Sequence, residues 1–378
     1  MNAAAEPQVL RELRLRDFRN FGEQRLELPD DGVLIVGRNG SGKTNLLEAI
    51  YYLETFRSLR GARDDQLVRF DADGFHLRGR FERGPVAEPR EVSVGYDGRT
   101  RTKRVMIDGI EAERLGDAIG RACVVAFSPA DVTLVSGGPS ERRRFLDIVL
   151  CLNRRGYLDA LQRYRQALKQ RNAMLKDGAE AALIEAYDAG LVDAGATVMH
   201  ERAEWVARHE ALFRDRYLHV AGRTAAMRYR PAPRADEAPA ERAGWAELLG
   251  GALRRHLPRD RERGVTSTGP HRDDVELSLG EEGLDLREYG SGGQQRAAAV
   301  ALRMVEAETI RRARGVEPII LMDDVFAEFD AERSERVLEL MDETERGQVI
   351  MTAPKEADVS PRGRSLPRWS IAAGVVSP

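Results

Sequence analysis

The segment Gly37 to Thr44, which reads GRNGSGKT, constrains the fold of this chain more than any other stretch. It follows the apolar run 33–36 and precedes apolar residues at the spacing of a helix. In such a strand, loop and helix, glycines turn backbone amides toward an anion, the lysine contacts the β and γ phosphates, and the threonine hydroxyl binds Mg2+. The alternative, a chance glycine-rich turn, rarely falls between a strand and a helix. The sequence therefore predicts a site for ATP and Mg2+ made by Gly37, Arg38, Asn39, Gly40, Ser41, Gly42, Lys43 and Thr44.

The length, charge and composition of the chain limit the number of lobes and the partners that we expect. At 378 residues the chain exceeds what one hydrophobic core usually organises, so we expect two lobes. The net charge of -3 gives no basic field over the whole molecule, so any contact with nucleic acid must come from a local patch. Two cysteines, a start without a leader pattern and the lack of a run of about 20 apolar residues predict a cytoplasmic protein that does not span a membrane.

Several segments have the pattern of strands. Residues 10–28 predict two strands around a turn, and the alternation over 75–107 predicts an antiparallel meander. The polar segments 229–244 and 259–264 are expected to interrupt regular structure. Further strands are expected at 124–127, 275–279, 284–286, 319–322, 348–351 and 369–372.

A helical stretch begins near Ser140. Apolar residues repeat every seven positions before and after a break at 177–178. We expect an antiparallel hairpin of two helices of about 30 residues, each about 45 Å long. Two ordinary core helices remain the alternative, because two or three heptads do not establish a coiled coil. The repeat positions are Leu161, Leu168 and Leu175, then Leu191, Val198, Trp205 and Leu212.

Two carboxylates directly follow the apolar run 319–322. Ligands of open α/β sheets sit at the carboxyl ends of strands, where this run would place Asp323 and Asp324. Asp323 suits Mg2+ held through water, and Asp324 is the candidate general base or water-orienting group for hydrolysis. A surface acidic pair is the alternative. We therefore predict Asp324 and Lys43 as catalytic residues, and Thr44 with Asp323 as the metal site.

The segment Ser291, Gly292, Gly293 and Gln294 precedes a predicted long helix. Free amides at a helix start, with a serine hydroxyl beside them, form an anion site. One phosphate loop gives the chain no need for a second phosphate site of its own. We therefore predict that this segment contacts the nucleotide of another protomer, so that ATP holds a head-to-tail dimer together. The alternative is a simple helix cap.

The most basic long stretch is 141–176. On a projecting helical lobe it could contact DNA phosphates without reading the base sequence, and Arg154, Arg155 and Arg163 are the candidate contacts. The alternative is a solvated helix face in a chain rich in arginine.

His271 lies within the segment GPHRDD. The six histidines show no metal-ligand spacing, so we expect a turn histidine held by Asp273 or Asp274 rather than a metal ligand.

In chain order, GRNGSGKT, SGGQ, IILMDD and the segment Glu328-Phe329-Asp330 resemble the motifs of an ABC-type ATPase head, with Asp330 at the position of the D-loop aspartate. Over nearly its whole length the chain resembles the RecF family of bacterial recombinational repair proteins. The segments that carry this resemblance are RDFRNFGE, FRSLRGARDDQLVRF, FSPADVTLVSGGPSERRRFLD, YRQALKQRN and TSTGPHRDD.

The resemblance implies an α/β fold with two lobes. Lobe I, a P-loop NTPase lobe with an antiparallel β subdomain, is similar to the heads of SMC and Rad50 proteins and is placed at 1–128 and 262–378. A helical lobe II, at 129–261, stands where those proteins carry coiled-coil arms. The resemblance also implies an ATP-dependent homodimer on duplex DNA and single-strand gaps, slow ATP hydrolysis, and action with RecO and RecR in RecA loading, replication restart and SOS induction.

Some positions depart from related ATPases. Ser128 stands where SMC heads have a glutamine, Thr352 and Ala353 stand where transporter ATPases have a switch histidine, and Asp324 replaces the usual catalytic glutamate. We therefore expect nucleotide binding and dimerisation to matter more than fast hydrolysis. One rival is a transporter ATPase subunit, in which the loop and the signature lie much closer in sequence than the roughly 250 residues here. The other is a binding module with a vestigial nucleotide site.

Overall fold

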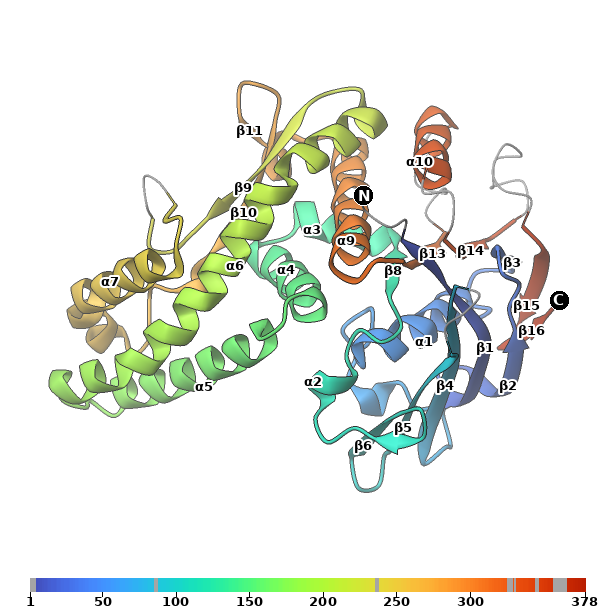
Figure 1. The fold of residues 1–378 in the computed structure, drawn as a ribbon, viewed down its shortest axis with the longest axis horizontal. Helices are drawn as coiled ribbons and strands as arrows, with labels where there is room; N and C mark the ends of the chain where they lie inside the picture. The colour runs from blue at the N-terminus through green and yellow to red at the C-terminus, as the bar shows by residue number, and fades with distance from the viewer. Residues whose placement is uncertain are drawn as a thin grey trace. The chain divides into compact units, whose positions relative to one another are not determined.

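A computed structural model describes residues 5–84, 88–234, 238–324, 329, 331–343, 347–355 and 366–378. The chain divides into two compact units (Figure 1). Unit 1 comprises residues 1–131 and 300–378, and unit 2 comprises residues 132–299. Among the described residues, no helix has the length and apolar character needed to cross a membrane.

A mixed six-stranded sheet forms one layer of unit 1, in the order β16-β15-β3-β14-β13-β8. All of its strands are parallel except β16, which pairs antiparallel with β15. Its central strands are mostly apolar because both faces of a parallel sheet are buried, and the polar residues Asp323 and Thr352 lie near the carboxyl ends of β13 and β14. The strands are β3 (Gly32–Val36), β8 (Val124–Phe127), β13 (Ile319–Asp323), β14 (Val349–Ala353), β15 (Arg368–Ala372) and β16 (Val375–Ser377).

A second sheet in unit 1 is almost wholly antiparallel, in the order β12-β1-β4-β5-β6-β7, with β2 also paired to β1. Its long strands alternate between buried and more exposed residues, as expected when one face packs on a core. The predicted pair of strands within 10–28 and the predicted meander are both confirmed. The strands are β1 (Glu6–Phe18), β2 (Phe21–Glu27), β4 (Gly74–Arg83), β5 (Arg90–Asp97), β6 (Thr102–Ile107), β7 (Ile110–Glu111) and β12 (Val316–Glu317).

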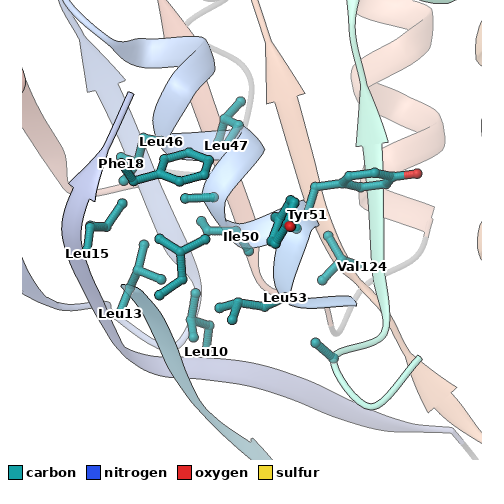
Figure 2. Packing of buried hydrophobic residues seen from close by; sticks show 14 of the residues in the cluster. Leu10, Leu13, Leu15, Phe18, Leu46, Leu47, Ile50, Tyr51, Leu53 and Val124 are labelled. Carbon is teal, nitrogen blue, oxygen red and sulfur yellow. The ribbon is translucent and has the colours of Figure 1, made fainter. Parts of the chain in front are cut away.

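Helix α1 (Lys43–Thr55) contacts strands of both sheets. Figure 2 shows its side chains Leu46, Ile50 and Leu53 packed in one apolar cluster with residues of β1 and with Val124 of β8. Almost no surface of these side chains remains accessible to water. Because α1 begins at Lys43, this core fixes the position of the phosphate loop just before it. Unit 1 also contains the helices α2 (Leu115–Ala118) and α10 (Ala331–Glu343) and the 3₁₀ turn η1 (Asp64–Gln66).

Unit 2 is mainly helical. Its helices α5 (Tyr157–Lys176) and α6 (Ala181–Ala221) form the predicted hairpin, with the turn at the predicted break. Neither helix has the expected length, because α6 has 41 residues and is about 60 Å long, whereas α5 has 20 residues and is about 30 Å long. The other helices are α3 (Thr133–Ser136), α4 (Pro139–Asn153), α7 (Arg242–Arg263) and α8 (Leu286–Tyr289). A small antiparallel sheet joins β9 (Ala225–Arg230), β10 (Asp274–Leu279) and β11 (Leu284–Asp285), while η2 (Pro129–Val132) and α9 (Gly292–Arg314) each begin in one unit and end in the other.

Two expectations differ from the structure. The predicted interruption at 259–264 is wrong, because α7 continues past Pro258 and ends where Gly264 takes a left-handed conformation with φ of 63°. The compact units also divide the chain differently from the expected lobes, since residues 262–299 belong to unit 2. The physical reason is that β10 pairs with β9, and the buried Arg171 of α5 donates hydrogen bonds to Asp260 and Thr266.

Candidate nucleotide site

The phosphate loop has backbone geometry that only glycine adopts readily. Gly42 has a φ of 117°, and a Cβ there would lie 2.6 Å from Nδ2 of Asn20. A Cβ at Gly37 would lie 2.5 Å from the side chain of Ile371. Gly40, with a φ of 80°, has no described atom within 4 Å of the position that a Cβ would take. The loop is therefore packed tightly at both ends and open at its tip.

Two neighbouring turns hold the loop in place through the Ser41 carbonyl. This oxygen accepts hydrogen bonds from Asn20 Nδ2 at 3.0 Å and from the backbone N–H of Gly374 at 2.9 Å. Asn20 Oδ1 in turn accepts from Asn45 Nδ2 on α1 at 2.7 Å. Asn20 and Gly374 follow β1 and β15, so both sheets of unit 1 contribute to the loop.

Lys43 is almost fully buried, and its ammonium group folds back over the loop. Its Nζ donates to the carbonyl of Gly37 at 2.7 Å and lies 3.5 Å from Oδ2 of Asp324. Arg38 and Asn39, by contrast, are exposed at the loop tip. The ammonium charge of Lys43 thus lies at the phosphate loop, and the carboxylate of Asp324 is its counterion.

The two sequence-predicted metal ligands are in direct contact. Thr44 Oγ1 lies 2.8 Å from Oδ2 and 3.0 Å from Oδ1 of Asp323. Sheet order explains this, because β14 lies between β3 and β13, so the loop after β3 and the end of β13 reach the same edge. Burial raises the pKa of Asp323 above its ordinary value, although the hydrogen bond with Thr44 opposes that rise.

Thr352 joins the two carboxylates. Its Oγ1 lies 3.1 Å from Oδ1 of Asp323 and 3.1 Å from Oδ1 of Asp324, and it accepts the backbone N–H of Asp324 at 3.1 Å. Asp324 has a φ of 47°, which non-glycine residues seldom adopt. This turn out of β13 directs its side chain toward Lys43. From the sequence, Thr352 was noted only because it stands where transporter ATPases have a histidine. Its contacts with the two aspartates follow from the strand register, in which Thr352 of β14 lies opposite Asp323 of β13.

The donor set at this edge suits Mg2+. A threonine hydroxyl and a carboxylate are hard oxygen ligands, which Mg2+ combines with water and phosphate oxygens. The nearly buried Ser41 Oγ has no hydrogen-bond partner among the described residues, as expected of a loop shaped to hold a further group. Within the same described residues, no cluster of three or more His, Cys, Asp or Glu side chains forms a separate metal site.

A buried carboxylate behind the loop connects two of the segments that carry the family resemblance. Glu48 of α1 is fully buried and accepts hydrogen bonds from Arg19 at 2.9 Å, Arg60 at 2.8 Å and Ser58 at 2.5 Å. Burial alone would raise the pKa of Glu48, but these hydrogen bonds outweigh it, so the pKa lies below its ordinary value. The segments RDFRNFGE and FRSLRG are therefore joined through α1.

The segment Ser291 to Gln294 lies at the start of α9, with Ser291 and Gly292 exposed. The backbone N–H of Ser291 donates to Oε1 of Gln294 at 2.8 Å, and the N–H of Gln294 donates to Ser291 Oγ at 3.3 Å. These two hydrogen bonds form a reciprocal helix cap. Within one chain, the segment therefore matches the alternative of a simple helix cap. Asp330, the predicted D-loop contact, lies outside the described residues.

The predicted DNA contacts differ in their surroundings. Arg154 lies 3.5 Å from Glu201 and from Glu204, and Arg163 lies 3.2 Å from Asp193. Arg155 is exposed and forms no ion pair with a described residue. Internal carboxylates thus balance part of the basic stretch, and Arg155 keeps its charge available to solvent.

The segment GPHRDD belongs to a buried polar network of unit 2. His271 was expected to be held by Asp273 or Asp274, and this is wrong. Its Nε2 donates to the carbonyl of Thr266 at 3.0 Å, and its Nδ1 accepts from the Tyr164 hydroxyl at 2.6 Å. Burial lowers the pKa of His271 to about 4.

The aspartates of this segment have other partners. Asp273 is fully buried beside Arg202 at 3.2 Å, and Asp274 pairs with Arg142 at 2.8 Å. Burial raises the pKa of Asp273 to about 6. The two aspartates thus join different arginines of the helices to the start of β10.

The chain is similar to known proteins over most of its length. The family model for the RecF/RecN/SMC N terminal domain matches residues 9–109. The DNA replication and repair protein RecF of Myxococcus xanthus is 39% identical over 350 residues, which cover 90% of this chain and 89% of that protein. A solved structure of the recombination mediator protein RecF with ATP, in the RecFOR pathway, has a TM-score of 0.89 and 29% identity, and the match covers 100% of this chain and 99% of that one.

A more distant structure shows the wider fold. The Smc head domain of Pyrococcus furiosus, solved with the C-terminal domain of ScpA, has a TM-score of 0.54 and 15% identity over 98% of this chain and 95% of that one. The α/β fold of an ABC-type ATPase head, expected from the motifs, is confirmed. With a relative 39% identical over 90% of its residues, the chain belongs to the RecF family, as its resemblance predicted.

Proposed function

We propose that the chain binds ATP at the phosphate loop and acts as an ATP-dependent DNA-binding protein of recombinational repair. The contact of Thr44 with Asp323 carries this proposal, because it places a hydroxyl and a carboxylate for Mg2+ beside the buried Lys43. The solved relative with ATP supports the choice of nucleotide. When bound, Mg2+ neutralises charge on the phosphate oxygens.

The chain's own residues have separate tasks in this proposal. The loop from Gly37 to Ser41 presents backbone amides to the phosphates, and Lys43 leaves Asp324 to contact the β and γ phosphates. Asp324, released from that ion pair, orients or deprotonates the attacking water. Thr352 keeps the backbone of Asp324 in place through its hydrogen bond to the N–H.

The second half of the site comes from another copy of the chain. Ser291 to Gln294 are exposed or half-buried at the start of a 23-residue helix, where partial positive charge and a hydroxyl favour an anion. In a head-to-tail dimer this segment covers the γ phosphate held by the partner's loop. ATP therefore promotes dimerisation, and hydrolysis, which we expect to be slow, reverses it.

The biological setting follows from the family. The solved relative is a recombination mediator of the RecFOR pathway. We infer the same setting for this chain, in which an ATP-bound dimer on duplex DNA or a single-strand gap acts with RecO and RecR to load RecA. Replication restart and SOS induction follow from that step. Identity of 39% to a DNA replication and repair protein favours this assignment over a transporter subunit.

Equilibrium binding of ATP tests the nucleotide assignment. Lys43→Ala should lower ATP affinity by at least about tenfold, because a charge-assisted contact to phosphate is lost. Lys169→Ala is the matched control, since this lysine is exposed on α5 and should leave affinity unchanged. Equal ATP affinity in the wild type and Lys43→Ala would reject the site, and the absence of binding in both would favour a vestigial one.

A further inference from the structure

Unit 2 contains a cavity that the proposed nucleotide site does not use. Its volume is about 850 Å³, within the usual range for pockets that take small ligands. It is lined by residues of the GPHRDD region, of β9 and β10, and of α8. Every lining residue belongs to unit 2, so the cavity is independent of the phosphate loop in unit 1.

The lining carries an excess of positive charge. The lining residues include five arginines and three carboxylates. Two of the arginines are neutralised, because Arg142 pairs with Asp274 at 2.8 Å and Arg230 pairs with Glu276. The other three, Arg234, Arg272 and Arg287, are exposed and form no ion pair with described residues.

A buried hydroxyl at the same cavity has no partner. Thr268 is 2% exposed, and its Oγ1 has no hydrogen-bond partner among the described residues. An unpaired buried hydroxyl costs free energy, so such a group usually has a water or ligand partner. Its neighbours are satisfied within the chain, since Ser267 Oγ donates to Asp260 at 2.6 Å. Thr268 is therefore a candidate hydrogen-bonding group for a ligand in the cavity.

We propose that this cavity binds the phosphate group of a small phosphorylated ligand, with Arg272 and Arg287 supplying charge and Thr268 a hydrogen bond. Guanidinium groups form paired hydrogen bonds with phosphate oxygens, and the surplus of two arginines over carboxylates in the lining matches a multiply charged group. The proposal gives the GPHRDD segment a ligand-binding role beside its buried contacts. It does not depend on ATP binding at the phosphate loop.

Equilibrium dialysis with labelled pyrophosphate at low salt tests the proposal. The wild type should bind about two pyrophosphates per chain, one at the phosphate loop and one in the cavity. Arg272→Gln/Arg287→Gln should remove the second while keeping the first, and Lys43→Ala should do the reverse. Arg254→Gln/Arg255→Gln is the matched control, because both arginines are exposed on α7 outside the cavity lining. An unchanged stoichiometry in Arg272→Gln/Arg287→Gln would overturn the proposal, whatever Lys43→Ala does.

Thr268→Val separates ligand binding from folding. Valine has nearly the shape of threonine and removes the unpaired hydroxyl, so the thermal midpoint should stay equal or rise. Pyrophosphate affinity at the cavity should fall by about tenfold, measured in the Lys43→Ala background. Unchanged affinity would show that the hydroxyl contacts no ligand and would contradict its part in the proposal.

A competition experiment shows whether the cavity binds the phosphate of a small molecule or the phosphates of the DNA backbone. In the Lys43→Ala background, AMP should displace pyrophosphate from the cavity, whereas a short duplex without terminal phosphates should not. Displacement by the duplex without terminal phosphates and not by AMP would contradict a small ligand, because the cavity would then bind the DNA backbone.

Discussion

The Thr44 hydroxyl lies 2.8 Å from Oδ2 of Asp323, although 279 residues separate them in the sequence. The contact exists because β14 lies between β3 and β13 and all three strands run in parallel. The loop after β3 and the two aspartates at the end of β13 therefore share one edge of the sheet. The Lys43 charge, the Thr44 hydroxyl and the Asp323 carboxylate are therefore grouped at that edge.

Thr352 should affect hydrolysis more than ATP binding. Thr352→Val leaves the N–H of Asp324 without its partner, which should cost about 1–3 kcal/mol of unfolding free energy. Turnover should fall by about tenfold while the ATP dissociation constant changes little, and Thr352→Ser should restore turnover. Steady-state hydrolysis and equilibrium ATP binding measure the two effects. Equal turnover in the wild type and Thr352→Val would show that the hydroxyl has no positioning role.

The wild type itself should hydrolyse ATP slowly. Asp324 is shorter than the usual glutamate and is paired with Lys43, so we expect a turnover at or below about 1 s⁻¹ without DNA, at the low end for enzymes. Many turnovers per second would contradict this.

Glu48 should stabilise unit 1 in a pH-dependent way. Its folded-state pKa is lowered, so its stabilisation is present above the ordinary pKa of 4.5 and is lost as the pH falls below that value. Glu48→Gln should lower the unfolding free energy by about 3 kcal/mol at pH 7, because Arg19 and Arg60 lose their buried counterion. Urea unfolding from pH 7 to pH 3 should show the two curves converging. A difference independent of pH would exclude the charge as the cause.

His271 should destabilise the fold in mild acid. Its pKa falls from 6.5 to about 4 on folding, so the folded state favours the neutral ring. Stability is therefore full above pH 6.5 and is lost as the pH falls toward 4, by about 3 kcal/mol in total. His271→Gln should show a flatter curve over this range in urea unfolding. Parallel curves for the two proteins would argue against a buried neutral histidine.

Arg155 should account for a measurable part of DNA affinity. The Arg154→Ala/Arg155→Ala/Arg163→Ala variant should bind duplex DNA more weakly and with a smaller salt slope. Because Arg154 and Arg163 already pair with carboxylates, Arg155→Ala alone should reduce the slope by about one. Fluorescence anisotropy over a salt series measures both. An unchanged affinity and slope in the triple variant would refute DNA contact by this part of unit 2.

The sequence predicted the local elements better than the contacts between them. An apolar run followed by two aspartates correctly predicted the strand β13, and Asp323 at its end contacts Thr44. The contacts of Thr352 and Asn20 depend on which strands are neighbours in the sheet and on which turns pack against the phosphate loop, and no local pattern encodes these. The polar segment 259–264 suggested a break, but α7 continues through Arg263.

The ion pairs of charged side chains also depend on packing between elements. A basic stretch in sequence says nothing of acidic side chains on the neighbouring helix, and Glu201 and Glu204 of α6 neutralise Arg154. The partners of His271 came from α5 and from the chain before it rather than from the adjacent aspartates.

Sedimentation velocity with ATP and gapped DNA tests the proposed dimer most directly. The wild type should sediment as a dimer with ATP and as a monomer without it. Lys43→Ala and Ser291→Arg should each remain monomeric alone, but an equal mixture should form an ATP-dependent heterodimer, because one composite site keeps an intact Lys43 and an intact Ser291. A wild type that stays monomeric with ATP and DNA, or a mixture that stays monomeric beside a dimeric wild type, would contradict a site shared between two copies.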